Sequence, residues 1–125
     1  MIPKFRAWLK KEQKMDNYID HISWLEDELY CIGDGITYMV SAEDLELMQS
    51  TGLVDKNGKE IFEGDIVKMS KDVYSEPTYY EVVRHRGGAY RLESKQHGCE
   101  LWLRHTDCEV VGNIYENPEL LEESK

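Results

Sequence analysis

Apolar and polar positions in this chain alternate in short runs that glycines and polar turns separate. The clearest case is the segment 51–68, TGLVDKNGKEIFEGDIVK. Asn57-Gly58 within it is typical of a tight hairpin turn, because asparagine and glycine readily adopt positive φ. The tripeptide Glu63-Gly64-Asp65 breaks the next apolar run, which resumes at once after it. We therefore predict a strand, a turn, a strand, a tight turn and a third strand in this segment.

The same pattern of short strands continues along the chain. Strands are expected over 2–8, 36–40, 79–83, 89–92, 99–103 and 109–111. In the segment 99–103, alternation places Cys99, Leu101 and Leu103 on one face of the strand. The segment 18–29 fits either a helix or a strand. The polar, proline-containing segment 70–78 is expected to form a mobile loop.

Two segments have the pattern of a short helix. Ser41, followed three residues later by Asp44, is typical of a helix N-cap, so about two helical turns are expected over 42–48. Leu45 and Met48 would face inward on that helix. Near the C-terminus, 116–121 is expected to form a turn and one acidic helical turn, followed by a frayed acidic tail at 122–125.

Taken together, these elements predict a mainly β fold. Several short strands at close spacing are typical of a small barrel or sandwich, here with one or two short helices. A length of 125 residues suits a single domain over 1–125, with its core over about 2–121. Small sheets must close, cover or pair their edges, so a homo-oligomer is also expected.

The chain shows no pattern typical of membrane insertion or export. No apolar run approaches the ~20 residues that a membrane helix needs. Charged residues interrupt the N-terminal segment, which therefore does not resemble a signal peptide. We expect a cytoplasmic protein with no membrane partner. Cys31, Cys99 and Cys108 are then expected to be reduced thiols rather than parts of a disulfide framework.

The charge distribution weighs against general nucleic-acid binding. The formal net charge is −10, which opposes a polyanion. The basic residues of the chain are concentrated in one segment, which contains Arg84, His85, Arg86, Arg91, Lys95 and Arg104, interleaved with Tyr79, Tyr80, Tyr90 and Trp102. Arginines and aromatic rings on a small barrel can hold phosphates and stack bases, so this face is a candidate for contact with nucleic acid or a partner. The alternative is a solvated hairpin whose charges balance acidic neighbours.

One combination of residues has the chemistry of a metal site. His97, Cys99, His105 and Cys108 lie close enough in the sequence to form a tetrahedral zinc site. Their spacing is unlike that of common zinc knuckles, so partly buried thiols and surface histidines are the preferred interpretation.

Other chemistry is not indicated. The acidic runs Glu26-Asp27-Glu28 and Glu43-Asp44-Leu45-Glu46 are typical of solvated faces. The sequence has neither a glycine-rich phosphate loop nor a nucleophile elbow. We expect no catalytic residues, no cofactor and no enzymatic activity.

Three segments together resemble one protein family. IPKFRAWLKKEQKM at 2–15, LMQSTGLVDKNGKEIFEGDIVK at 47–68 and EVVGNIYENPELL at 109–121 are similar, in order and spacing, to the YopX family of phage and prophage proteins. Leu9 departs from that pattern, because an acidic residue is more usual there. Residues 70–105 are the least family-like.

The resemblance implies a mainly β fold of small coiled sheets that includes an SH3-like barrel. In that fold the structural turns are assigned to Asn57, Gly58, Gly64, Asp65, Gly112 and Asn113. The resemblance also implies a non-enzymatic phage or prophage accessory protein in the bacterial cytoplasm, which assembles with itself and binds a host or phage protein. The alternatives are an acidic DNA mimic that inhibits a host DNA-binding protein, and a nucleic-acid binder that uses the Arg84–Arg104 face.

Overall fold

The computed structural model describes residues 5–19, 21–25, 28–33, 36–41, 44–70, 76–85, 88–94 and 98–123, and within 17–43 it describes the backbone. The chain divides into two compact units, Met1–Ser50 and Thr51–Lys125. The single folding domain expected from the chain length stays a prediction, because compactness does not measure cooperativity of folding.

The first unit is built from small antiparallel sheets. Its strands are β1 (Phe5–Leu9), β2 (Lys14–Ile19), β3 (His21–Leu25), β4 (Glu28–Gly33), β5 (Ile36–Ser41) and the first part of β6 (Leu45–Val54). Strand β1 lies between β2 and β6, while β3, β4 and β5 form a separate three-stranded sheet in that order. The ambiguous segment 18–29 is therefore strand wherever it is described.

The helix predicted over 42–48 is wrong where it is described, because 45–48 is strand, and residues 42 and 43 lie outside the described residues. Strand β6 begins at Leu45 and pairs with β1, with Leu45 opposite Leu9 and Gln49 opposite Phe5. Leu45 and Met48 are both buried, as expected, but they are buried from a strand. An isolated helix of two turns is poorly stabilised because its nucleation is costly, whereas β1 supplies hydrogen-bond partners along this stretch.

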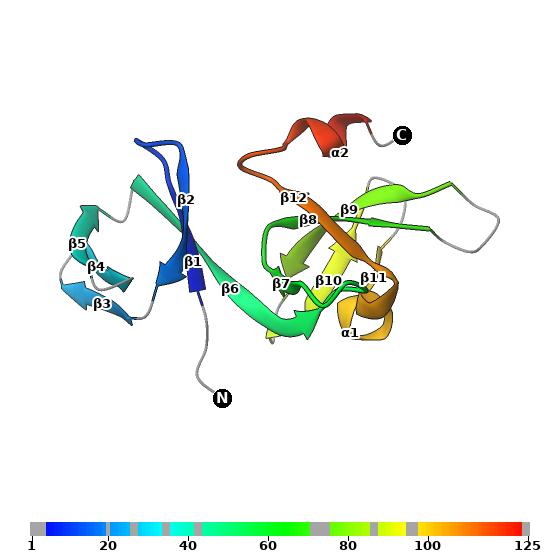
Figure 1. The fold of residues 1–125 in the computed structure, drawn as a ribbon, viewed down its shortest axis with the longest axis horizontal. Helices are drawn as coiled ribbons and strands as arrows, with labels where there is room; N and C mark the ends of the chain where they lie inside the picture. Colours follow the sequence, from blue (N-terminus) through cyan, green and yellow to red (C-terminus); the bar gives the residue numbers. More distant parts are fainter. Residues whose placement is uncertain are drawn as a thin grey trace. The chain divides into compact units, whose positions relative to one another are not determined.

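The second unit contains the end of β6, then β7 (Glu60–Phe62), β8 (Asp65–Met69), β9 (Thr78–Arg84), β10 (Tyr90–Glu93) and β11 (Gly98–Glu100). The short helix α1 (Leu101–Arg104), a 3₁₀ turn (His105–Asp107), β12 (Glu109–Asn113) and α2 (Glu119–Glu123) follow. Five strands form one antiparallel sheet in the order β11-β10-β9-β8-β12 (Figure 1). The strand–turn–strand–turn–strand pattern predicted over 51–68 is observed. Residues 71–75 of the predicted mobile loop lie outside the described residues.

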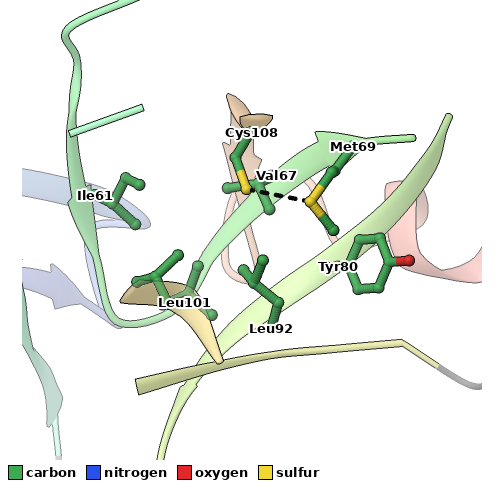
Figure 2. Packing of buried hydrophobic residues seen from close by; sticks show 8 residues of the cluster. Ile61, Val67, Met69, Tyr80, Leu92, Leu101 and Cys108 are labelled. Carbon is green, nitrogen blue, oxygen red and sulfur yellow. Dashed lines mark hydrogen bonds between the residues drawn. The ribbon is translucent and has the colours of Figure 1, made fainter. Parts of the chain in front are cut away.

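One hydrophobic core organises the second unit. Figure 2 shows buried side chains from β7, β8, β9, β10, α1 and the segment before β12 converging on one cluster. The buried members are Ile61, Val67, Met69, Tyr80, Val82, Leu92, Leu101 and Cys108. Leu53, Tyr90, Cys99 and Val110 pack against them. The core therefore joins residues from both ends of this unit.

The strand predicted over 99–103 is correct only up to Glu100. The chain then turns into α1, where Leu101 is fully buried but Leu103 is 58% exposed. Successive residues on a helix are rotated by about 100°, so Leu101 and Leu103 point in different directions. The predicted shared face of Cys99, Leu101 and Leu103 is wrong for this reason.

The predicted fold class is confirmed as a mainly β fold of small coiled sheets with short helices. The SH3-like barrel of that prediction corresponds to a curled sheet that forms a half-barrel. In the part of the chain that is described, no helix has the length and apolar character needed to cross a membrane.

Candidate interaction surface

Asp55 connects the central hairpin turn to β12, 55 residues further along the chain. Its Oδ1 accepts hydrogen bonds from the backbone N–H groups of Asn57 at 2.8 Å and Lys59 at 2.9 Å. Its Oδ2 accepts one from the N–H of Val110 at 2.9 Å. The backbone N–H of Lys56 also donates to the carbonyl of Cys108 at 2.9 Å. The carboxylate thus holds the turn and fixes it against the edge of the sheet.

The electrostatics of Asp55 reflect these contacts. The side chain is 3% exposed, and burial alone raises its pKa. Hydrogen bonds from Val110, Lys59 and Asn57, with the positive charge of Lys59, outweigh burial and lower the pKa below 3.8. A carboxylate that accepts several backbone N–H groups is stabilised in its charged form. Sequence reasoning missed this role, although aspartate at the first position of a turn is a known signal.

The turn itself differs in detail from the one suggested by Asn57-Gly58. The N–H of Gly58 donates to the carbonyl of Asp55 at 3.0 Å, and Gly58 has a φ of +82°. The N–H of Asp55 donates to the carbonyl of Lys59 at 2.8 Å. This is a type I turn followed by a left-handed glycine, a common hairpin connection. Gly58 therefore supplies the positive φ, and Asn57 occupies an ordinary position of the turn.

Gly64 and Asp65 form the second, tighter turn. Gly64 has a φ of +87°, and Asp65 Oδ2 accepts a hydrogen bond from the N–H of Phe62 at 2.8 Å. The N–H of Gly64 donates to the carbonyl of Val82 at 2.9 Å, and its carbonyl accepts from Ile114 at 2.9 Å. Asp65 therefore stabilises the turn, and the backbone of Gly64 joins the turn to β9 and to the segment after β12.

Asn113 organises the segment after β12. Its Oδ1 accepts hydrogen bonds from the N–H groups of Tyr115 at 3.0 Å and Glu116 at 2.8 Å, and its Nδ2 donates to Glu116 Oε1 at 2.7 Å. Asn117 Oδ1 accepts from the N–H of Asn113 at 3.3 Å. A Cβ at Gly112 would lie 2.5 Å from Asn117 Oδ1. The GNIYENP motif is thus a hydrogen-bonded turn whose glycine admits the Asn117 side chain.

The four zinc candidates do not converge in the described structure. His97 lies outside the described residues. His105 Nδ1 contacts the carbonyl oxygen of Val54 at 2.7 Å, where it acts as the donor. Cys99 is opposite Leu92 in the sheet and packs against the core. Among the residues that the structure describes, no group of three or more His, Cys, Asp or Glu side chains is arranged to hold a metal ion.

Cys108 behaves as a small core side chain. It is fully buried, and its Sγ lies 3.7 Å from Met69 Sδ and 3.3 Å from the carbonyl oxygen of Arg104, with the thiol as donor (Figure 2). Burial, and secondarily the neighbouring Cys99, raises the pKa of the Cys108 thiol to about 12. Burial also raises the pKa of Cys99, against the lowering effect of Arg104 and Arg91. Both groups are protonated thiols near neutral pH.

The arginines predicted to share one face are divided. Arg84 is opposite Tyr90 in the sheet, and Arg91 is opposite Val83. Because neighbouring residues of a strand point to opposite faces, Arg84 and Arg91 lie on different faces of the sheet. Arg91 pairs with Glu100 at 2.7 Å, and Arg104 pairs with Asp107 at 3.0 Å. Arg86 lies outside the described residues.

A small acidic cluster lies beside this hairpin. Glu81 is directly opposite Glu93, and the pKa of Glu81 is raised by burial and then by the charge of Glu93. Glu93 Oε2 contacts His85 Nε2 at 2.5 Å. The histidine therefore contacts one of two facing carboxylates. Sequence reasoning missed the pair, because it depends on strand register.

Among the described residues, the two most exposed large apolar side chains lie in α1, while Val54 and Val111 are less exposed. Trp102 is 64% exposed and Leu103 is 58% exposed, and they are consecutive residues. Val54 is 45% exposed, and its backbone carbonyl accepts a hydrogen bond from His105 just after α1. We call the exposed pair Trp102 and Leu103 the α1 patch. The sequence feature that indicates this patch is the run of three consecutive apolar residues at 101–103.

The chain is similar to known proteins in sequence and in fold. The family model described as YopX protein matches residues 4–122. The solved structure of protein EF1440 from Enterococcus faecalis is similar, with 31% identity, a TM-score of 0.64, and coverage of 97% of this chain and 99% of that chain. Protein yopX from Bacillus subtilis shares the fold, with 22% identity, a TM-score of 0.66, and coverage of 94% and 96%. None of the curated proteins compared with the chain matches it. The chain belongs to the YopX family.

Proposed function

We propose that this chain is a non-enzymatic accessory protein of a phage or prophage, which acts in the bacterial cytoplasm by assembling with itself and binding a protein partner. The observation that carries the proposal is the α1 patch. Large apolar side chains that are more than half exposed are costly in water, and adjacent ones with an aromatic member are typical of protein interfaces. Trp102 is the residue type most often found at the energetic centre of such interfaces.

The roles of the polar residues support binding rather than chemistry. Asp55, Asp65 and Asn113 are buried, and their side chains accept backbone hydrogen bonds within turns. Cys108 has a protonated thiol that faces the core. A nucleophile needs exposure and an activating neighbour, which Cys108 lacks.

A capture experiment tests the proposal. Tagged wild-type chain, Trp102→Ala and Leu120→Ala would be incubated with lysate of a bacterial host, and bound proteins would be quantified by mass spectrometry. Leu120→Ala is the matched control, since Leu120 is a partly exposed leucine of α2, which lies at the opposite end of this unit from α1 (Figure 1). Partner proteins should be at least about tenfold depleted with Trp102→Ala alone. Equal recovery with all three chains would contradict the proposal.

The net charge of −10 favours a second candidate, an acidic DNA mimic that inhibits a host DNA-binding protein. Its charged surface would include Glu26, Asp27 and Glu28, of which the first two lie outside the described residues. Replacing all three with glutamine should then abolish capture of a host DNA-binding protein. Capture that is unchanged by this replacement would eliminate the candidate.

A further inference from the structure

We infer that Asn57 is a site of spontaneous covalent modification, where the side-chain amide is lost through a cyclic imide at a rate that Asp55 controls. The inference goes beyond partner binding and does not depend on the α1 patch. Its basis is the Asn57-Gly58 sequence, the exposure of both residues and the hydrogen bonds that hold the reacting nitrogen.

The reaction needs only the chain itself and water. The backbone nitrogen of Gly58 forms a bond to Asn57 Cγ, and the side-chain nitrogen leaves as ammonia with the proton that the backbone nitrogen loses. Water then opens the cyclic imide at one of its two carbonyls. One product is aspartate with an ordinary main chain. The other is isoaspartate, in which the main chain runs through Cβ and Cγ of residue 57.

The position of this pair in the structure favours the reaction. Asn57 and Gly58 are both exposed, so water reaches the amide and the imide. Glycine has no Cβ that would hinder the attacking nitrogen. In the described part of the chain, no heavy atom beyond the adjacent residues lies within 4 Å of the place that a Cβ of Gly58 would take. This is also the one Asn-Gly pair in the sequence.

The closed turn opposes the reaction. The N–H of Gly58 donates to the carbonyl of Asp55 at 3.0 Å, so loss of its proton would break a hydrogen bond. The third position of a type I turn, which Asn57 occupies, also has a ψ of about 0°. That angle directs the Gly58 nitrogen away from the Asn57 side chain, whereas ring closure needs the two on the same side. Attack therefore requires the turn to open.

Asp55 controls this opening. Its carboxylate accepts hydrogen bonds from the N–H groups of Asn57 and Lys59, on either side of the reacting bond, and from Val110 in β12. Local opening has to break these bonds, so the rate of modification follows the stability of the junction. Isoaspartate adds one methylene to the main chain and displaces the N–H of Gly58 from its acceptor. This product therefore prevents the turn from closing again in its original geometry.

Peptide mapping by mass spectrometry tests the inference, after incubation of the full chain at mildly alkaline pH and with chromatographic separation of aspartate from isoaspartate. Asn57 should be modified in the folded chain at least about 30-fold more slowly than in the chain unfolded by urea. Asp55→Asn keeps the shape of the side chain but removes its charge, and it should accelerate modification of the folded chain about tenfold. Thermal unfolding verifies that each variant is folded.

Two controls separate this effect from others. Asp107→Ala removes an exposed ion pair away from the turn and should leave the rate within about twofold of wild type. Asn57→Gln should abolish the reaction at this position, because the longer side chain does not place its amide carbon for the same ring. If Asp55→Asn does not fold, a urea series below the unfolding transition replaces it. The rate at Asn57 should then rise in proportion to hydrogen exchange of the Gly58 amide.

Three results would overturn the inference. The first is an unmodified Asn57 in the unfolded chain, which would remove the site. The second is an equal rate in the folded and unfolded chains, which would show that the turn has no control. The third is a rate in folded Asp55→Asn, or across the urea series, that stays at the wild-type value while the turn opens more often.

Discussion

Asp55 Oδ2 accepts a hydrogen bond at 2.9 Å from the backbone N–H of Val110, and the same carboxylate holds the turn in which it lies. One buried side chain therefore closes a local hairpin and joins it to the last strand of the sheet. The contact joins the hairpin segment to the segment after residue 108, two segments that are far apart in the sequence. Each supplies half of one hydrogen-bonded junction.

Replacing Asp55 should destabilise the fold strongly. Asp55→Ala removes the acceptor of three backbone N–H groups, and we expect a loss of about 2–4 kcal/mol in the free energy of unfolding. Urea unfolding with a fixed m-value measures it. Asp107→Ala is the control, because it removes an exposed ion pair with Arg104 and should cost less than about 1 kcal/mol. Equal losses for the two variants would show that the junction is not important for stability.

The stability contribution of Asp55 should depend on pH in one direction. Its folded-state pKa lies below the ordinary value of 3.8, so its contribution is complete above that pH and is lost as the pH falls through the folded-state pKa. The stability difference between wild type and Asp55→Asn should therefore shrink below pH 3.8. Urea unfolding at a series of acidic pH values measures this. A stability difference that stays constant with pH would mean that the charge of Asp55 does not contribute to the stability of the fold.

Gly112→Ala should disrupt the turn after β12 by steric overlap. The added Cβ would lie 2.5 Å from Asn117 Oδ1 and 2.9 Å from Asn117 Cβ, so the Asn117 side chain has to move. We expect a cost of about 1–3 kcal/mol, measured by urea unfolding. In an Asn117→Gly background the obstacle is absent, and the cost of Gly112→Ala should fall to less than about 1 kcal/mol. A double-mutant cycle without coupling would refute this account.

The cysteines should differ in reactivity toward a thiol reagent. With Cys31→Ser present to remove the third thiol, Cys99 should react before Cys108 in the folded chain. Cys108 is fully buried with a pKa of about 12, so it should react only after unfolding by denaturant. Time-resolved labelling at pH about 8 measures the two rates. Rapid labelling of both thiols without denaturant would contradict the packing around Cys108.

Binding to nucleic acid should be absent or very weak. Arg84 and Arg91 lie on opposite faces of the sheet, and Arg91 and Arg104 are paired with carboxylates. Fluorescence anisotropy with single- and double-stranded DNA, at about 50 and about 200 mM salt, checks this. The prediction would be contradicted by tight binding that weakens steeply with salt and is lost when Arg91 and Arg104 are replaced with alanine. That result would support a nucleic-acid-binding face formed by these arginines.

Sequence reasoning succeeded where structure is set by neighbouring residues. The turns at Gly58 and Gly64 depend on backbone conformations that glycine adopts without strain, and both turns are where the pattern placed them. The predictions from sequence were wrong where the secondary structure depends on a residue that is distant in the sequence. Ser41 was interpreted as a helix N-cap, but the residues from Leu45 onward form strand β6 because they pair with β1. No residue within 99–103 indicated that the strand ends at Glu100.

The candidate surface was only partly predictable for the same reason. The basic residues were visible in the sequence, but whether Arg84 and Arg91 share a face depends on which residue of β9 lies opposite which residue of β10. The hydrogen bond from Val110 to Asp55 joins two segments that are far apart in the sequence. No local sequence pattern indicates that these segments lie side by side. Trp102 and Leu103 were recognised as apolar, and their exposure follows from the rotation of α1.

The position of β12 in the sheet has a consequence for synthesis on the ribosome. Strand β8 has β9 on one side and β12 on the other, and Val110 is made 43 residues after Val67, its partner in β8. At roughly 5–20 residues per second, this interval lasts about 2–9 s. During that time one edge of β8 has no partner strand from its own chain, so the nascent protein is exposed to pairing with other chains. Slow translation prolongs this state, and truncation before residue 108 makes it permanent. In either case the unpaired strand makes the chain a substrate for chaperones and proteases.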